Sequence, residues 1–246
     1  MKVSTPLSLA STTALAGGFA ALAAFLVAAP VSAADNFSTG QPKVKLVLSG
    51  QVNKALLFAD DGNTSRKMIV DNPAASTRVN FSAEAPVTAD FSFGAQHEAE
   101  IPTNNASVVT LQGNGDYNQA SRSFVARKSE VMATHKRFGK LSLGMGSTAT
   151  DGVIEADLSN TAVSGNYADS ALVGAAILFY NSGTKTTSGS PAVGDVFNTL
   201  NGGNEDRVRY DTPTFAGFTG SVAGVSGGAS DAALAYSGKI GAFALA

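Results

Sequence analysis

The stretch DRVRYDTPTFAGF, residues 206 to 218, holds the charged side chains whose spacing is most informative about this chain. Arg207 and Arg209 alternate there with Val208 and Tyr210. Successive side chains of a β-strand point to opposite faces, so such a strand has one cationic face and one apolar face. A guanidinium stays charged whatever its neighbours do, so the pattern predicts a permanently charged sheet face.

Residues suited to enzymatic or metal chemistry are scarce. The 246 residues contain no cysteine, which excludes disulfides, thiolate zinc sites and cysteine nucleophiles. The two histidines, His97 and His135, fall in separate predicted strands, where we expect surface or rim positions and no metal ligation. No Ser/His/Asp set stands at a recognisable spacing. We therefore expect no enzymatic activity, no cofactor and no resident metal.

The overall charge gives no support for nucleic acid as a partner. The chain carries 17 Lys and Arg against 19 Asp and Glu, a formal charge of −2, and its pI is near 5.7. Nucleic-acid binding would need a basic face. Charged residues make up only 15% of the chain, below the roughly 25% of ordinary soluble domains.

The N-terminal segment has the features of an export signal. Lys2 is the only charge before Asp35, and the apolar run ALAGGFAALAAFLVAA covers residues 14 to 29. Small residues follow in VSAAD, which predicts a signal peptide over residues 1–33 and cleavage after Ala33 or Ala34. The alternative is a membrane anchor, because the uncharged stretch is long enough to span a bilayer.

The rest of the chain is dominated by alternation with a period of two residues. It predicts one strand over residues 44 to 58, with Lys54 alone violating the apolar face, and further strands in STRVNFSAEA, ADFSFGAQHEAE and KLSLGMGS. The segment 121 to 138 has the length of a strand, but its faces are ambiguous. The fold class predicted is all-β and antiparallel.

Short and long connectors alternate along the chain. The short ones cover residues 84–90, 136–140 and 211–217, and the polar long ones cover 60–76, 101–121 and about 148–204. Outer-membrane barrels keep their turns short on one side only. Together with export and strands of about ten residues, this favours a transmembrane up-and-down β-barrel over an exported β-sandwich.

The sequence also resembles the general porins of Gram-negative outer membranes. The resemblance runs from about residue 44 to 240, and its most specific set is FGKLSLGMGSTATDGVIEADLSNT followed by RVRYDTPTFAGF. It implies a 16-stranded barrel, usually a homotrimer in outer-membrane lipid, that passes ions and small hydrophilic solutes by diffusion. The domain implied covers residues 34–246.

In such porins a long external loop folds into the barrel, and its acidic residues face basic residues on the wall. The resemblance places this constriction loop at about residues 148–204. Opposed charges in a narrow throat orient dipolar solutes and set ion preference. The acids implied are Asp151, Glu155 and Asp157, and the wall bases are Arg78, Arg127, Arg207 and Arg209.

Two alternatives stay open for these residues and for the chain. The three loop acids could bind calcium, although the spacing lacks the remaining ligands of an EF-hand. The chain could also be a non-conducting surface barrel or exported β-sandwich that acts as an adhesin or binding protein. We count about eight strands from residue 44, with GAFALA opening a ninth, so we expect the N-terminal half to two-thirds of a porin.

Overall fold

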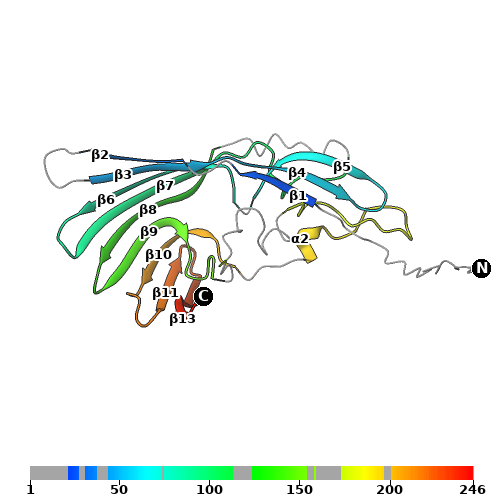
Figure 1. The fold of residues 1–246 in the computed structure, drawn as a ribbon. Coiled ribbons are helices and arrows are strands. Elements are labelled where there is room, and N and C mark those ends of the chain that lie inside the picture. The colour runs from blue at the N-terminus through cyan, green and yellow to red at the C-terminus, as the bar shows by residue number, and fades with distance from the viewer. Residues whose placement is uncertain are drawn as a thin grey trace, which may run out of the picture.

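The computed structural model describes residues 22–27, 31–37, 44–73, 75–112, 124–153, 158, 173–196 and 201–245. Most of these residues form one large antiparallel sheet whose strand order is β12-β11-β10-β9-β8-β7-β6-β3-β2. The sheet bends from β2 round to β12 and is open, so the described strands do not close into a barrel (Figure 1). Its strands are β2 (Val31–Phe37), β3 (Val44–Gln51), β6 (Arg78–Pro86), β7 (Phe91–Glu100), β8 (Val125–His135), β9 (Gly139–Ser147), β10 (Asn204–Asp211), β11 (Phe218–Val225) and β12 (Ser230–Tyr236).

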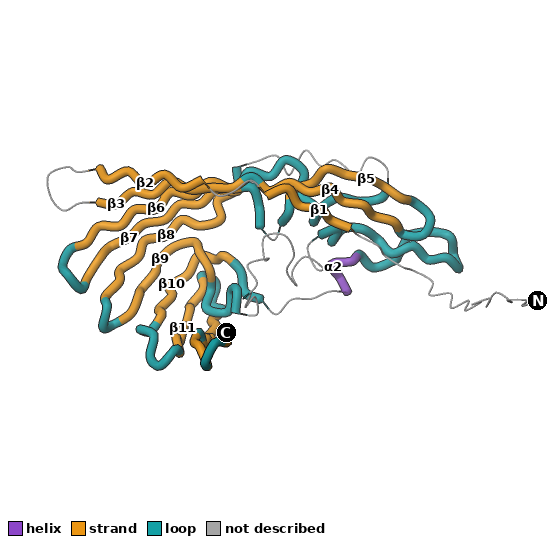
Figure 2. The backbone as a smooth tube through the Cα atoms, viewed as in Figure 1, coloured by secondary structure: helices purple, strands orange, loops and turns teal. Residues whose placement is uncertain are grey.

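From β6 to β12 every strand pairs with the next strand along the chain, which is the up-and-down topology that the alternation predicts. The short turns after β6, β8 and β10 lie at one end of the sheet (Figure 2). The long connections 101–124 and 148–203 leave from the other end, where the turn between β11 and β12 is short. The predicted asymmetry of connectors therefore holds from β6 to β11, and the short turn between β11 and β12 departs from it. The fold is all-β as expected.

The residue alternation gives the sheet an apolar face and a polar face. Val208 pairs with Leu143 on one face, and its neighbour Arg207 pairs with Gly144 on the other. The same phase continues across β11, where Val222 pairs with Tyr210. Because cross-strand partners share a face, a largely apolar surface covers one side of these strands.

A second sheet continues beyond the end of the large one. It has the order β1-β4-β5, formed by β1 (Leu22–Val27), β4 (Asn53–Asp60) and β5 (Ser65–Asp71). The single strand predicted over 44 to 58 is therefore wrong, because the chain changes sheets at Val52. Asn53 causes the break: its amide N–H donates to Thr77 Oγ1 at 3.0 Å and its side-chain Nδ2 donates to Ala75 O at 2.8 Å.

The predicted connector 60–76 is likewise wrong in part, because it contains β5. One face of the β4–β5 hairpin is buried under segments of the two long connections, and on β5 Met68 and Val70 are buried whereas Ile69 between them is exposed. This core consists of Ala55, Leu57, Ala59, Met68 and Val70 from the hairpin, and Ala106, Val109, Leu111, Ile177 and Val193 from the connections.

Three smaller features complete the fold. A short hairpin, β13 (Gly238–Ile240) and β14 (Phe243–Leu245), follows β12. The one-turn helix α2 (Val193–Val196) lies in the second long connection. No helix among the described residues has the length and apolarity to cross a membrane. Strand β1 and the start of β2 lie within residues 1–33, the predicted signal peptide. Cleavage of this segment stays a prediction.

Candidate pore wall

All four arginines expected on the wall lie on the polar face of the large sheet, and each is paired with a carboxylate of the same wall. The sequence-based expectation set these bases against acids of the long loop instead. The partners are Glu98 and Glu100 on β7, Glu130 on β8 and Asp211 on β10.

Arg207 is the most deeply buried of the four. Its side chain is 3% exposed, and Nη2 donates to Glu130 Oε2 at 2.7 Å. The guanidinium crosses the whole of β9 to reach β8, and donates on the way to the carbonyls of Ser147 (3.0 Å) and Gly144 (3.1 Å). The crossing needs glycine on that face of β9 at positions 144 and 146: a Cβ at Gly146 would lie 2.7 Å from Arg207 Nη2. Arg207 is thus a brace within the wall.

Arg209 connects its own strand to the start of the long connection. Its Nη2 donates to Asp211 Oδ1 at 2.7 Å, and Nη1 donates to Thr148 O at 2.6 Å. Ser221 on β11 also donates to Asp211 Oδ1 at 2.7 Å, and the Lys140 ammonium lies 3.5 Å from Asp211 Oδ2. This cluster ties β9, β10 and β11 together on the polar face.

Arg78 and Arg127 share a carboxylate. Arg78 Nη1 and Arg127 Nε donate to Glu98 Oε1 at 3.3 and 2.9 Å, and Arg127 also lies 3.5 Å from Glu100. A β-bulge between β7 and β8 puts Arg127 beside Glu98. An extra residue in one strand shifts the phase of alternation, which is why the faces of segment 121–138 are ambiguous in the sequence. Side chains of Arg78 and Arg127 are 21% and 24% exposed, so this pair is more accessible than Arg207.

The structure gives only part of the predicted acid set of the long loop. Asp151 lies in the turn that follows β9 and is half-buried, whereas Glu155 and Asp157 lie outside the described residues. Within the described ranges, no group of three or more histidine and carboxylate side chains could hold a metal ion. The charges placed together by the structure are therefore those of the wall itself.

The long connection begins by crossing the polar face. Asp231 on β12 accepts hydrogen bonds from Ala149 and Thr150, which follow β9 directly. Strands β9 and β12 are three positions apart in the sheet, which is about 14 Å if the sheet is flat. The two or three residues that follow β9 do not readily span that distance. The sheet therefore curves toward its polar face, which is the inner one. The described middle of the connection, residues 173–196, packs farther on against β4 and β5.

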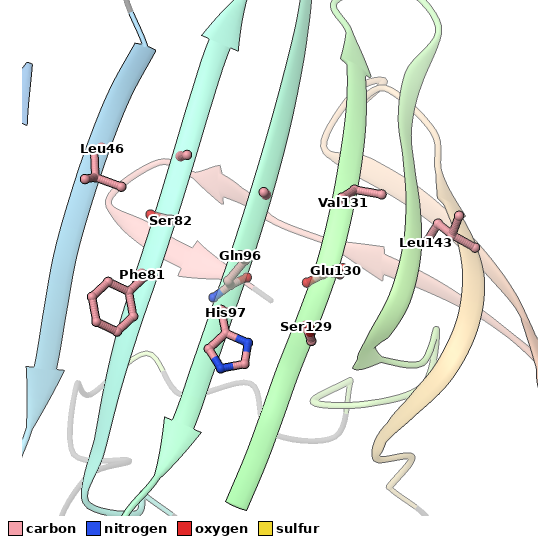
Figure 3. Close-up of a pocket in the computed structure, with 11 residues that line it drawn as sticks. Leu46, Phe81, Ser82, Gln96, His97, Ser129, Glu130, Val131 and Leu143 are labelled. Atoms are coloured by element: carbon pink, nitrogen blue, oxygen red, sulfur yellow. The ribbon is translucent and has the colours of Figure 1, made fainter. Parts of the chain in front are cut away.

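The outer face is apolar and exposed along the whole sheet. A hollow of about 380 Å³ on this face is lined by side chains that include Ala83 and Ala95. Figure 3 shows Leu46, Phe81, Val131 and Leu143 around it, on four different strands. His97 and Ser129, which are cross-strand partners beside Phe81, are polar side chains on this face, as is Asp206 on β10. Large exposed apolar side chains on this face include Leu48, Phe81, Phe93, Val131, Leu141, Leu143, Val208, Tyr210, Val222 and Leu234.

An up-and-down antiparallel sheet with an apolar outer face and a charged inner face defines the class of transmembrane β-barrel proteins. The chain matches the family model of the Gram-negative porins over residues 18–245, and it belongs to that family. Neither the search of curated proteins nor the search of solved structures found a match. The family places the protein in the outer membrane.

Proposed function

We propose that this protein passes ions and small hydrophilic solutes by passive diffusion through a water-filled pore, without a cofactor and without enzymatic chemistry. The observation that carries the proposal is the pair of faces of the sheet: charged side chains of neighbouring strands lie on the inner face, and Leu, Val and Phe side chains lie on the outer face. Lipid requires such an outer face, and a charged lumen requires water. The working form is a homotrimer of closed barrels.

Selectivity should be weak, because the wall charges are paired with one another. A guanidinium and a carboxylate 2.7–3.3 Å apart act on a distant ion as a dipole, whose field falls off faster than that of a single charge. Arg78 and Arg127 together face Glu98 and Glu100, so that cluster is also balanced. The loop acids Asp151, Glu155 and Asp157 then act as the constriction charges on the side of the long connection.

Planar-bilayer conductance of the purified protein, with the reversal potential measured in a salt gradient, tests this function. Arg78→Gln removes a partly exposed inner-face charge and leaves Glu98 its bond to Arg127, so the barrel should stay folded. We expect a shift of the reversal potential toward cation preference. Arg137→Gln, in the exposed turn between β8 and β9, is the matched control and should not shift it. A folded protein that passes no current would overturn the proposal.

The alternative, a non-conducting surface barrel or an exported β-sandwich acting as an adhesin, predicts folded protein without ion flux. Nine of the described strands form one curved sheet, and the core of the second described sheet, β1-β4-β5, packs against the long connections and not against the apolar face of the large sheet. That arrangement supports the pore over the sandwich, and extraction of the protein without detergent would favour the sandwich.

A further inference from the structure

The two ends of the long connection meet in a narrow neck, which we define as residues 147–153 and 201–204. Thr148 N donates to Gly203 O at 2.9 Å, and Gly152 N donates to Asn201 Oδ1 at 2.8 Å. The neck is tight: a Cβ at Gly202 would overlap Thr148 Oγ1 and would lie 2.7 Å from Thr150 Oγ1. The described ends of the connection therefore move as one body.

This neck is held against the wall from β12. Asp231 Oδ1 accepts from Ala149 N at 3.1 Å, and Asp231 Oδ2 accepts from Thr150 N at 2.8 Å and from Thr150 Oγ1 at 2.7 Å. Ala149 and Thr148 are 1% and 5% exposed, and Thr150 and Asp231 are half-buried, so the contact is partly shielded from water. Hydrogen bonds to an ionised acceptor are the strong ones, and shielding strengthens them further.

Arg209 holds the same peptide group from the opposite side. Its guanidinium donates to Thr148 O at 2.6 Å, and the N–H of that peptide, carried by Ala149, points to Asp231. One peptide dipole is thus fixed between a cation on β10 and an anion on β12, each stabilising one end. Both hydrogen bonds join a strand of the wall to the long connection, and neither joins two strands of the wall.

We propose that Asp231 is the positioning residue of the long connection: with Arg209 it fixes the neck over the inner face of the sheet and thereby sets how far the connection narrows the pore. The proposal rests on the pore function proposed above. It predicts that loss of the Asp231 carboxylate releases the neck without unfolding the strands, because the pairing of β12 with β11 does not depend on that side chain.

The experiment compares the wild type with Asp231→Ala, the milder Asp231→Asn and Thr150→Val, which removes only the hydroxyl donor. Hydrogen–deuterium exchange of residues 147–153 in detergent reports the neck directly, and single-channel recording reports the pore. We expect exchange of the Ala149 and Thr150 amides to become about tenfold faster or more in Asp231→Ala, with new conductance substates. Asp206→Asn, an exposed acid on β10, is the charge-matched control and should match the wild type.

Unchanged exchange in both Asp231 variants would overturn the proposal, whatever the conductance does. Faster exchange with an unchanged conductance would also overturn it, because the neck would then not set the pore. If Asp231→Ala fails to fold, Asp231→Asn and Thr150→Val decide the same question. A wild type that passes no current, with exchange still faster in the variants, would refute the pore function and with it the link from the neck to the pore.

Discussion

The buried pair of Arg207 and Glu130 gives the sharpest quantitative prediction. The two side chains are 3% and 8% exposed. Their hydrogen bond crosses β9 where that strand has glycine, at Gly144 and Gly146. In Arg207→Met, Glu130 keeps no hydrogen-bond partner among the described residues, so a buried carboxylate is left uncompensated. Removal of one partner of a buried pair costs about 3–5 kcal/mol of the free energy of unfolding.

Removing the charge of the other partner, in Glu130→Gln, should lower the free energy of unfolding by less, because Arg207 has further hydrogen-bond acceptors. In Glu130→Gln the guanidinium keeps its bonds to Ser147 O and Gly144 O. Only one charge-assisted hydrogen bond is lost, about 1.5–3 kcal/mol. The double variant contains no unpaired charge, so its cost should fall short of the sum of the two single costs by about 1–3 kcal/mol.

Urea unfolding of the detergent-solubilised protein, followed by far-ultraviolet circular dichroism, measures all three costs. Arg137→Met, in an exposed turn, is the control and should stay within about 0.5 kcal/mol of the wild type. Equal costs for the two single variants, or costs that add in the double variant, would refute the view that Arg207 is a brace of the wall.

Three further predictions concern the outer face, the hairpin and the leader. Leu143→Arg, at the middle of β9 on the apolar face, should lower the free energy of unfolding in lipid by about 2–4 kcal/mol; a cost below about 1 kcal/mol would place that face away from lipid. Burial alone would raise the pKa of Asp71, but hydrogen bonds from Lys54 and from the backbone amides of Asn104 and Thr103 outweigh it and hold the pKa below its ordinary value. Its stabilisation of the β4–β5 hairpin is therefore full above about pH 4 and lost as the pH falls through the lowered pKa, which protease cleavage of the hairpin should show and which Asp71→Asn should abolish. N-terminal sequencing of the protein from outer membranes should begin after Ala33 or Ala34, and a start at Met1 would favour the anchor.

Much of the fold could be predicted because alternation reports the faces of a strand directly. DRVRYD keeps a strict period of two, and Arg207 and Arg209 lie on the face that this period gives. The segment around Arg127 could not be assigned, since a bulge changes the phase within the strand. The prediction of one strand over residues 44 to 58 was wrong for a different reason. The period of two continues through Val52, although the chain passes there from one sheet to another.

The ion-pair partners could not be predicted, because they depend on register and not on spacing along one strand. Glu98 and Glu100 alternate visibly in ADFSFGAQHEAE, but nothing in the sequence shows that Arg127 lies across from them. Asp231 carries no local signal at all: its contact with Thr150 joins residues 81 positions apart and exists only because the sheet curves. Lys54, the apparent violation of an apolar face, is explained by its pairing with Asp71.

The passage of the chain from β3 to β4 has a structural consequence. Val52 alone separates the two strands, so no linker joins the second sheet to the first. The eight residues of β4 extend about 27 Å as a direct continuation of the wall. Segments of both long connections pack beneath the hairpin. The hairpin and these segments therefore lengthen the wall on this side, beyond the end of the large sheet.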